Sequence, residues 1–203
     1  FSPNGKHIKL KLDKPDMILD RQKFDLYFYN QAKKRGAKFF FSHRLIKADE
    51  YVAHIKDLGL GKTRKIKFEY IIGADGPMSP VAKSAGLLKG RKYFIGIQAV
   101  VKRKNSNKID FYPLPEGFGW AVPEDKNTLR VGVASRQNPK KDFDTLLKKY
   151  PGKIISRQGG LIPLFDPKQV FSRKDAYLLG DAAGLVKATT GGGLVPGLRS
   201  AEI

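Results

Sequence analysis

The chain has 203 residues, with 39 Lys and Arg against 19 Asp and Glu, and a formal net charge of +20. This length can bury a core in one large or two small domains, and 41% hydrophobic residues exclude a disordered polycation. The absence of Cys excludes a disulfide scaffold, a thiolate metal site and a cysteine nucleophile within the chain. No apolar run approaches the roughly 18 residues of a membrane span. We therefore expect a soluble, cytoplasmic and basic protein.

The basic residues are spread along the whole chain. The densest runs, at residues 33–35 and 102–104, are three residues long, whereas basic arms and tails carry blocks of five or more like charges. A solvated Lys-rich surface accounts for this distribution. A surface for nucleic acid or for an anionic membrane is the alternative.

The first 90 residues predict a helix followed by a small antiparallel insert. Residues 6–12 alternate apolar and basic side chains, which is typical of an exposed strand. A helix is then expected between Asp20 as its N-cap and Gly36 as its C-cap. Three further strands are expected at residues 38–45, 51–58 and 64–72. Gly59 and Gly61 favour a turn between the last two of them.

From residue 93 the pattern changes to short strands separated by Asn, Pro and Gly turns. Strands are expected at residues 93–101, 108–112, 119–122 and 128–134, with one helix at 142–150 and a returning strand at 176–179. This mixture predicts an α/β or α+β fold. We divide it into residues 1–90, an antiparallel layer at 91–172, and a return to the first domain at 173–203.

The first candidate site is Tyr-Ile-Ile-Gly-Ala-Asp-Gly-Pro-Met-Ser-Pro at residues 70–80. An apolar strand meets a tight turn at Asp75 and Gly76, and Pro77 and Ser79 suit the first turn of a helix that runs through Ala85. A strand that enters a helix through glycine presents free N–H groups to an anion such as phosphate. An ordinary turn with a capping acid is the alternative.

The second candidate site has the same order of strand, acid and glycine. It reads Tyr-Leu-Leu-Gly-Asp-Ala-Ala-Gly-Leu at residues 177–185, and Thr-Thr-Gly-Gly-Gly-Leu follows at 189–194. An acid such as Asp181, at the end of an apolar strand, can accept hydrogen bonds from sugar hydroxyls. Three consecutive glycines cost conformational entropy, which is explained if main chain must lie against a flat ligand ring. A flexible linker is the alternative, which the apolar residues on both sides, at 185–186 and 194–195, disfavour.

These motifs resemble those of a known enzyme family. Residues 73–79 resemble the "DG" motif, and residues 180–184 the "GD" motif, of FAD enzymes with the aromatic-hydroxylase fold. Within that fold the chain is most similar to the geranylgeranyl reductase family, especially archaeal reductases of isoprenoid lipids. That family also has a Thr-Gly-Gly-Gly segment, as at 190–193, an aromatic-x-Trp-x-x-Pro element, as at 118–123, and an Arg-x-x-Phe-Asp helix start, as at 21–25.

The resemblance implies roles for individual residues. Arg21 would reach the FAD phosphates, and Asp181 would bind a ribityl or ribose hydroxyl. Gly193 and Leu194 would place amide N–H groups near the flavin N1 edge, where a helix N-terminus suits the negative charge of reduced flavin. The implied cofactor residues are Arg21, Leu45 (through backbone to adenine), Asp75, Gly76, Gly180, Asp181, Gly192, Gly193 and Leu194. The implied substrate residues are Phe118, Trp120 and Pro123.

The sequence departs from the family pattern in several places. No Gly-x-Gly-x-x-Gly follows a strand, the family's cysteine near the flavin is absent, and Ala188 stands where Pro is usual. Pro196 predicts that the helix after the glycines starts late or bends. The chain begins with Phe and stops within an expected helix. We therefore expect part of a longer protein, without the N-terminal βαβ unit of an FAD-binding domain.

The function that this resemblance implies is an FAD-dependent oxidoreductase that reduces C=C bonds of polyprenyl groups on a lipid. Its partners would be an isoprenoid lipid, an electron donor (NAD(P)H or ferredoxin) and, through the basic surface, an anionic membrane. No catalytic residue and no metal site are assigned, because the three His share no ligand spacing. The alternatives are a flavin monooxygenase, halogenase or quinone-linked dehydrogenase of the same fold, and a basic nucleic-acid-binding module, which the even charge distribution disfavours.

Overall fold

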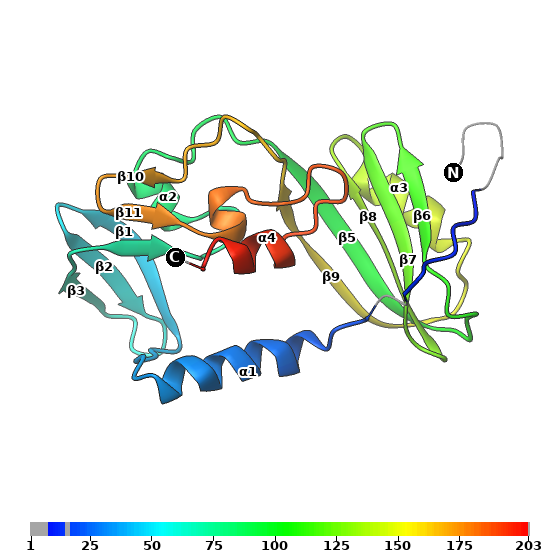
Figure 1. The fold of residues 1–203 in the computed structure, drawn as a ribbon, viewed down its shortest axis with the longest axis horizontal. Helices are drawn as coiled ribbons and strands as arrows, with labels where there is room; N and C mark the ends of the chain where they lie inside the picture. Colours follow the sequence, from blue (N-terminus) through cyan, green and yellow to red (C-terminus); the bar gives the residue numbers. More distant parts are fainter. Residues whose placement is uncertain (1–7, 15–16, 203) are drawn as a thin grey trace.

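The computed structural model describes residues 8–14 and 17–202, which form three sheets and their covering helices (Figure 1). In chain order the elements are α1 (Arg21–Lys34), β1 (His43–Asp49), β2 (Val52–Asp57), β3 (Thr63–Lys67), β4 (Ile71–Gly73), α2 (Pro80–Ser84), β5 (Tyr93–Lys102), β6 (Asp110–Leu114), β7 (Gly117–Asp125), β8 (Thr128–Ser135), α3 (Pro139–Leu147), β9 (Lys153–Pro163), β10 (Ser172–Arg173), β11 (Ala176–Leu178), the 3-10 helix η2 (Gly180–Ala183) and α4 (Leu194–Arg199). The predicted mixture of helices with antiparallel sheets is confirmed.

Helix α1 forms where the capping residues predict it. The Asp20 carboxylate accepts the N–H groups of Gln22 and Lys23, both at 3.1 Å, which satisfies two of the free donors at the start of the helix. Gly36 has φ +89 and follows the last turn, as a C-terminal glycine should. No residue of α1 is buried, and the helix runs below the other elements, between the five-stranded sheet and the β1–β3 sheet (Figure 1).

The antiparallel sheet β1-β2-β3 is present, but two of its predicted strand boundaries were wrong. The strand expected at 38–45 starts at His43, because Ser42 has φ +56 and its carbonyl accepts the N–H of Leu58. The strand expected at 64–72 is two strands, since the chain leaves this sheet after β3 and β4 pairs with β11 in another. Of the strand expected at 6–12, residues 8–12 are not a strand, and residues 6 and 7 lie outside the described part.

The second sheet brings the two candidate motifs together. β11 runs parallel to β4, with Leu178 opposite Gly73, and β10 pairs with the other side of β11. A Cβ on Gly73 would lie 2.8 Å from both Leu178 Cδ2 and Val81 Cβ, so only glycine lets α2 pack this closely. The carboxyl ends of parallel strands meet at one edge of a sheet. The turn after β4 and the turn after β11 are therefore neighbours.

The third sheet has the strand order β6-β7-β8-β5-β9, and α3 covers one of its faces. The core between α3 and the sheet consists of Ala99, Val101, Ala121, Leu129, Val131, Val133, Phe143 and Leu146. Sequence reasoning missed β9 entirely, because Ser-Arg-Gln-Gly-Gly within it is typical of a loop. It forms a strand because β5 pairs with it along almost its whole length.

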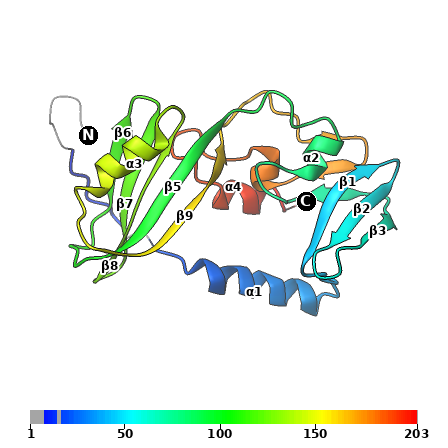
Figure 2. The same cartoon turned by 180° about the vertical axis from the view of Figure 1, so that it is seen from behind.

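The other face of this sheet, which we call the open face, points toward α4. Figure 2 shows α3 on the near side of the sheet, whereas α4 lies farther from the viewer, beside the end of β9. On the open face, Trp120 lies opposite Gly132, and Gly132 lies opposite Gln98 on β5. A Cβ on Gly132 would lie 2.6 Å from Trp120 Cε2, so the indole lies directly on the glycine.

Ser79 is the N-cap of α2 and should stabilise the folded protein. Its side chain is fully buried, and its Oγ accepts the N–H of Ala82 at 2.8 Å. Ser79→Ala should therefore lower the free energy of unfolding by about 1 kcal/mol, as measured by urea denaturation. Ser106→Ala, in an exposed loop, is the control and should leave it unchanged. Equal midpoints for both variants would contradict the role of this cap.

Candidate functional site

Asp181 lies in η2, immediately after β11, and its carboxylate is half-buried. Within residues 8–14 and 17–202, the structure gives this carboxylate no hydrogen-bond donor. Burial raises the pKa of Asp181, and the positive charge of Arg21 on α1 opposes that rise. The Asp181 carboxylate is therefore free to accept a hydrogen bond from a ligand. The Arg21 guanidinium is close enough for its charge to stabilise the ionised carboxylate.

The start of α4 lies directly against this carboxylate. Gly193 is the N-cap of α4, and a Cβ on it would lie 2.6 Å from Asp181 Oδ1. Leu194 begins the helix immediately after the glycines, and Pro196 fits within the first turn, where its missing N–H costs nothing. The predicted late start is thus not observed. Gly180 packs on α4 as well, since its N–H donates to Ser200 Oγ at 3.1 Å.

Residues 187–193, which we call the glycine-rich loop, connect Asp181 and the start of α4 to the open face of the five-stranded sheet. The loop is closed on itself by bonds from Gly191 N–H to the Lys187 carbonyl and from Lys187 N–H to the Gly192 carbonyl. Gly191 has φ +63, and a Cβ on it would lie 3.1 Å from Ile162 Cγ2 and 3.5 Å from Phe118 Cζ. The main chain of the loop at Gly191 thus lies beside the side chains of Ile162 and Phe118 on the sheet.

Two of the three predicted substrate residues lie together on the open face. The Phe118 ring contacts Trp120 at a centroid distance of 5.8 Å and Phe94 at 5.9 Å. Pro123 pairs with Leu129, which belongs to the core under α3. The structure therefore places Pro123 on the opposite face from Phe118 and Trp120.

In the turn after β4, Asp75 caps a helix. Its Oδ2 accepts the N–H of Val81 at 3.3 Å, beside the cap that Ser79 provides. Gly76 has φ +85, and no atom lies within 4 Å of a Cβ placed on it, so its backbone is open to a ligand. Asp75 matches the capping alternative, whereas Gly76 and Gly192 offer bare main chain.

Arg91 was missed by sequence reasoning, because no motif marks it. Its Nη1 donates to the backbone carbonyl of Asp181 at 3.5 Å and its Nε to Gln169 Oε1 at 3.2 Å. Its Nη2 is buried and, among the described residues, has no hydrogen-bond partner. Tyr93, two residues on, donates its hydroxyl to the Pro77 carbonyl at 3.1 Å. The segment that starts β5 therefore joins both candidate turns.

Two other predicted residues have different settings. Arg21 begins α1, is mostly exposed and has its Nη2 3.4 Å from Asp25 Oδ1. Leu45 lies on β1, where it pairs with Ile55, and its side chain packs against the core cluster of α2 and β11. It is not part of the group formed by Asp181 and Gly193.

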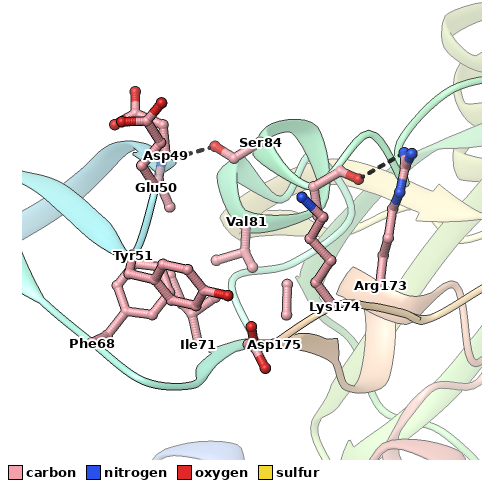
Figure 3. A pocket seen from close by; sticks show the side chains of 13 residues that line it. Asp49, Glu50, Tyr51, Phe68, Ile71, Val81, Ser84, Arg173, Lys174 and Asp175 are labelled. Carbon is pink, nitrogen blue, oxygen red and sulfur yellow. Dashed lines mark hydrogen bonds between the residues drawn. The ribbon is translucent and has the colours of Figure 1, made fainter.

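A cavity of about 500 Å³ lies elsewhere, between α2 and the turns β1–β2 and β10–β11 (Figure 3). Tyr51 and Asp175 face each other in it, and Arg173 donates to the Ala85 carbonyl. This cavity is at the amino ends of β4 and β11. Ligands of parallel sheets bind beyond the carboxyl ends of the strands, so we place the functional site at Asp181 instead.

The comparisons with known proteins identify the class. The profile of the FAD binding domain family matches residues 7–133, and the chain belongs to that family. Its curated relatives include digeranylgeranylglycerophospholipid reductases of Methanococcoides burtonii, at 29% identity over 96% of this chain, and Methanocaldococcus jannaschii, at 30% over 96%. A geranylgeranyl diphosphate reductase of Rhodobacter capsulatus is 28% identical over 96%. The predicted resemblance is confirmed.

Solved structures agree on the fold. A geranylgeranyl bacteriochlorophyll reductase-like protein of Thermoplasma acidophilum superposes with a TM-score of 0.76 at 21% identity, over 92% of this chain and 54% of that one. A flavin-dependent halogenase superposes with a TM-score of 0.72 at 17% identity, over 90% and 38%. The three curated relatives are covered over 53%, 55% and 54% of their own length. The chain thus spans about half the length of the curated relatives it matches.

The residues at the site fit FAD. A sugar hydroxyl needs a hydrogen-bond acceptor, and the Asp181 carboxylate is an acceptor to which no described residue donates. A pyrophosphate needs cations, and Arg21 and the unpaired Nη2 of Arg91 are present. A flat ring needs bare main chain, and Gly192 and Gly193 provide it at the start of α4.

Proposed function

We propose that this chain supplies one part of the FAD site, and the apolar substrate surface, of an oxidoreductase that reduces C=C bonds of polyprenyl groups on a lipid. The observation that carries the proposal is the contact of Gly191 with Phe118 and Ile162. Because of this contact, main chain suited to a flavin edge adjoins an aromatic surface suited to a prenyl chain.

In this proposal each cofactor residue has one task. Asp181 accepts a hydrogen bond from a sugar hydroxyl, Arg21 neutralises phosphate, and the N–H groups of Gly193 and Leu194 stabilise negative charge on the flavin ring. Gly76, Gly180 and Gly192 leave room for the cofactor, Asp75 fixes the first turn of α2, and Leu45 offers its backbone to adenine. The remaining FAD contacts would come from sequence that the longer relatives have.

FAD, once bound and reduced, would supply a hydride to one carbon of the alkene, and a proton would add to the other. The chain's own contribution is to place the alkene and exclude water, which Phe118, Trp120 and Phe94 do as a continuous apolar surface. Pro123 supports the strand from the other face. We assign no proton donor among these residues.

Relatives named for isoprenoid-lipid and geranylgeranyl reduction support this substrate class. An external reductant is required, and NAD(P)H and ferredoxin are the two candidates. None of the helices in the described part of the chain is long and apolar enough to traverse a bilayer. We propose that the protein meets its lipid peripherally, at an anionic membrane surface that its charge of +20 favours.

The proposal is tested with the complete protein, loaded with FAD and reduced chemically. It should convert a geranylgeranyl lipid to products that gain two hydrogens for each double bond removed, as measured by mass spectrometry. A phenylalanine or tryptophan substrate tested with halide and oxygen should remain unchanged. Halogenation or hydroxylation with no saturation of the prenyl chain would favour the halogenase-like alternatives of the same fold and refute the proposal.

Arg91 provides a further prediction about the cofactor. If its unpaired Nη2 faces an FAD phosphate, Arg91→Met should raise the Kd for FAD by about tenfold or more, the usual value of a charge-assisted hydrogen bond. The Kd is measured by quenching of flavin fluorescence. Arg136→Met, which removes an exposed ion pair with Glu116, is the matched control and should bind FAD normally. Equal affinity in the two variants would contradict this role.

A further inference from the structure

The open face of the five-stranded sheet changes character along its strands. Near the glycine-rich loop, Phe118 lies in a row with Ala134 and Gly96, which continues to Gly160. This end is apolar and is the end that Gly191 touches. Starting from this end, successive rows on the same face are two residues apart along each strand.

The next row contains Trp120 and a pair of amides. Trp120 lies on Gly132, and beside them Gln98 Nε2 donates to Gln158 Oε1 at 2.6 Å. The register connects all four residues across β7, β8, β5 and β9. This second row is therefore apolar on β7 and β8, where Trp120 lies, and polar on β5 and β9, where the two amides lie.

The far rows carry more basic than acidic side chains: Arg130, Lys102 and Lys153 against Glu124 and Asp125, of which Asp125 pairs with Thr128. Val122 pairs with Arg130, and beyond them Thr128 pairs with Lys102, which in turn pairs with Lys153. Lys102 and Lys153 are exposed and have no acidic partner in the described residues. Arg130 pairs with Glu124, but its Nε is buried without a hydrogen-bond partner in this part of the chain. Glu124 alone therefore does not satisfy this guanidinium.

The separation suits an amphiphile that lies along the face. Four residues of antiparallel strand separate the Phe118 row from the Arg130 row, which is about 14 Å. A prenyl chain can lie over Trp120 with its alkene at the loop while its anionic end reaches the cations. Arg is the side chain best suited to phosphate, because its planar fork binds two oxygens at once.

We infer that the far end of the open face, centred on Arg130 and flanked by Lys102 and Lys153, binds the phosphate of the lipid substrate. The inference rests on the proposed function, which it extends by naming the end of the sheet that holds the headgroup. Glu124 holds Arg130 until the phosphate replaces it. The apolar rows bind the chain of any prenyl lipid, and the cationic row selects those with phosphate.

The test uses the complete, FAD-loaded protein and two lipids with the same chain, geranylgeranyl phosphate and geranylgeraniol. Calorimetry should show that Arg130→Gln raises the Kd for the phosphate by about tenfold or more, with the Kd for the alcohol unchanged. Glu124→Gln should tighten binding of the phosphate, a gain that misfolding cannot produce. Lys141→Gln, which removes one exposed charge from α3 on the opposite face, is the matched control and should change neither. Inorganic phosphate, which lacks the chain, should bind far more weakly than the lipid.

The outcomes separate this inference from the proposed function. If Arg130→Gln weakens both lipids equally or neither, if Lys141→Gln has the same effect, or if inorganic phosphate binds as tightly as the lipid, the inference is overturned. Reduction of the prenyl chain can still occur in that case, and the proposed function stands. If the phosphate lipid binds through Arg130 but is never reduced, the proposed function fails and the phosphate site stands.

Discussion

Asp181→Ala is expected to weaken FAD binding by about ten- to one-hundredfold, because a hydrogen bond from a sugar hydroxyl to a carboxylate contributes roughly 1.5–3 kcal/mol. The carboxylate lies beside Gly193 and has no donor among the residues that the structure describes, so it is free to accept one. The Kd for FAD is measured by flavin fluorescence titration. Retention equal to that of the unchanged protein would contradict the sugar-binding role.

Asp181→Asn tests what the buried charge of Asp181 costs the stability of the protein in the absence of FAD. Burial raises the pKa of Asp181, which means that folding disfavours its charged form. The cost is present at neutral pH and disappears as the pH falls through the raised pKa toward the usual 3.8. The apo form of Asp181→Asn should therefore be more stable than the unchanged protein at pH 7 and equally stable near pH 3. Thermal unfolding at both pH values measures this, and a loss of stability at pH 7 would contradict it.

Gly132→Ala is expected to lower the free energy of unfolding by about 1–3 kcal/mol, because a methyl group there overlaps the Trp120 ring. The same change should impair reduction of the prenyl chain, since the displaced ring belongs to the proposed substrate surface. Stability is measured by urea denaturation and activity by the formation of saturated product.

A second substitution tests the cause of this effect. Trp120→Leu makes room above residue 132, so the combination with Gly132→Ala should lose less stability than the two single changes added together. Gly160→Ala is the control on the same face, because no atom lies within 4 Å of a Cβ there. Additive losses in the double variant, or an equal loss in Gly160→Ala, would show that overlap with Trp120 is not the cause.

The sequence predicted most reliably what local chemistry determines. Asp20 and Ser79 cap their helices because a short acceptor before a helix satisfies its free N–H groups. The two strand-acid-glycine motifs, which the sequence identified separately, meet because β4 and β11 are parallel neighbours. The structure also places Gly191 of the Thr-Gly-Gly-Gly segment next to Phe118 of the aromatic-x-Trp-x-x-Pro element. No local sequence pattern predicts that these two segments are neighbours.

Features fixed by partners distant in the chain were not predictable in the same way. β9 has a loop-like composition and is a strand because β5 pairs with it. The face on which Pro123 lies depends on its pairing with Leu129 rather than on the motif around it. Arg91 lies outside every motif, and its position depends on Gln169 and on the carbonyl of Asp181, about eighty to ninety residues away along the chain.

The central claim is that Asp181 and the start of α4 form part of a flavin site. The most direct measurement is the flavin spectrum of the purified complete protein, before and after the addition of FAD and removal of the excess. We expect flavin absorbance at one FAD for each chain, and a marked loss of it in Asp181→Ala. A colourless protein that takes up no added FAD would contradict the claim.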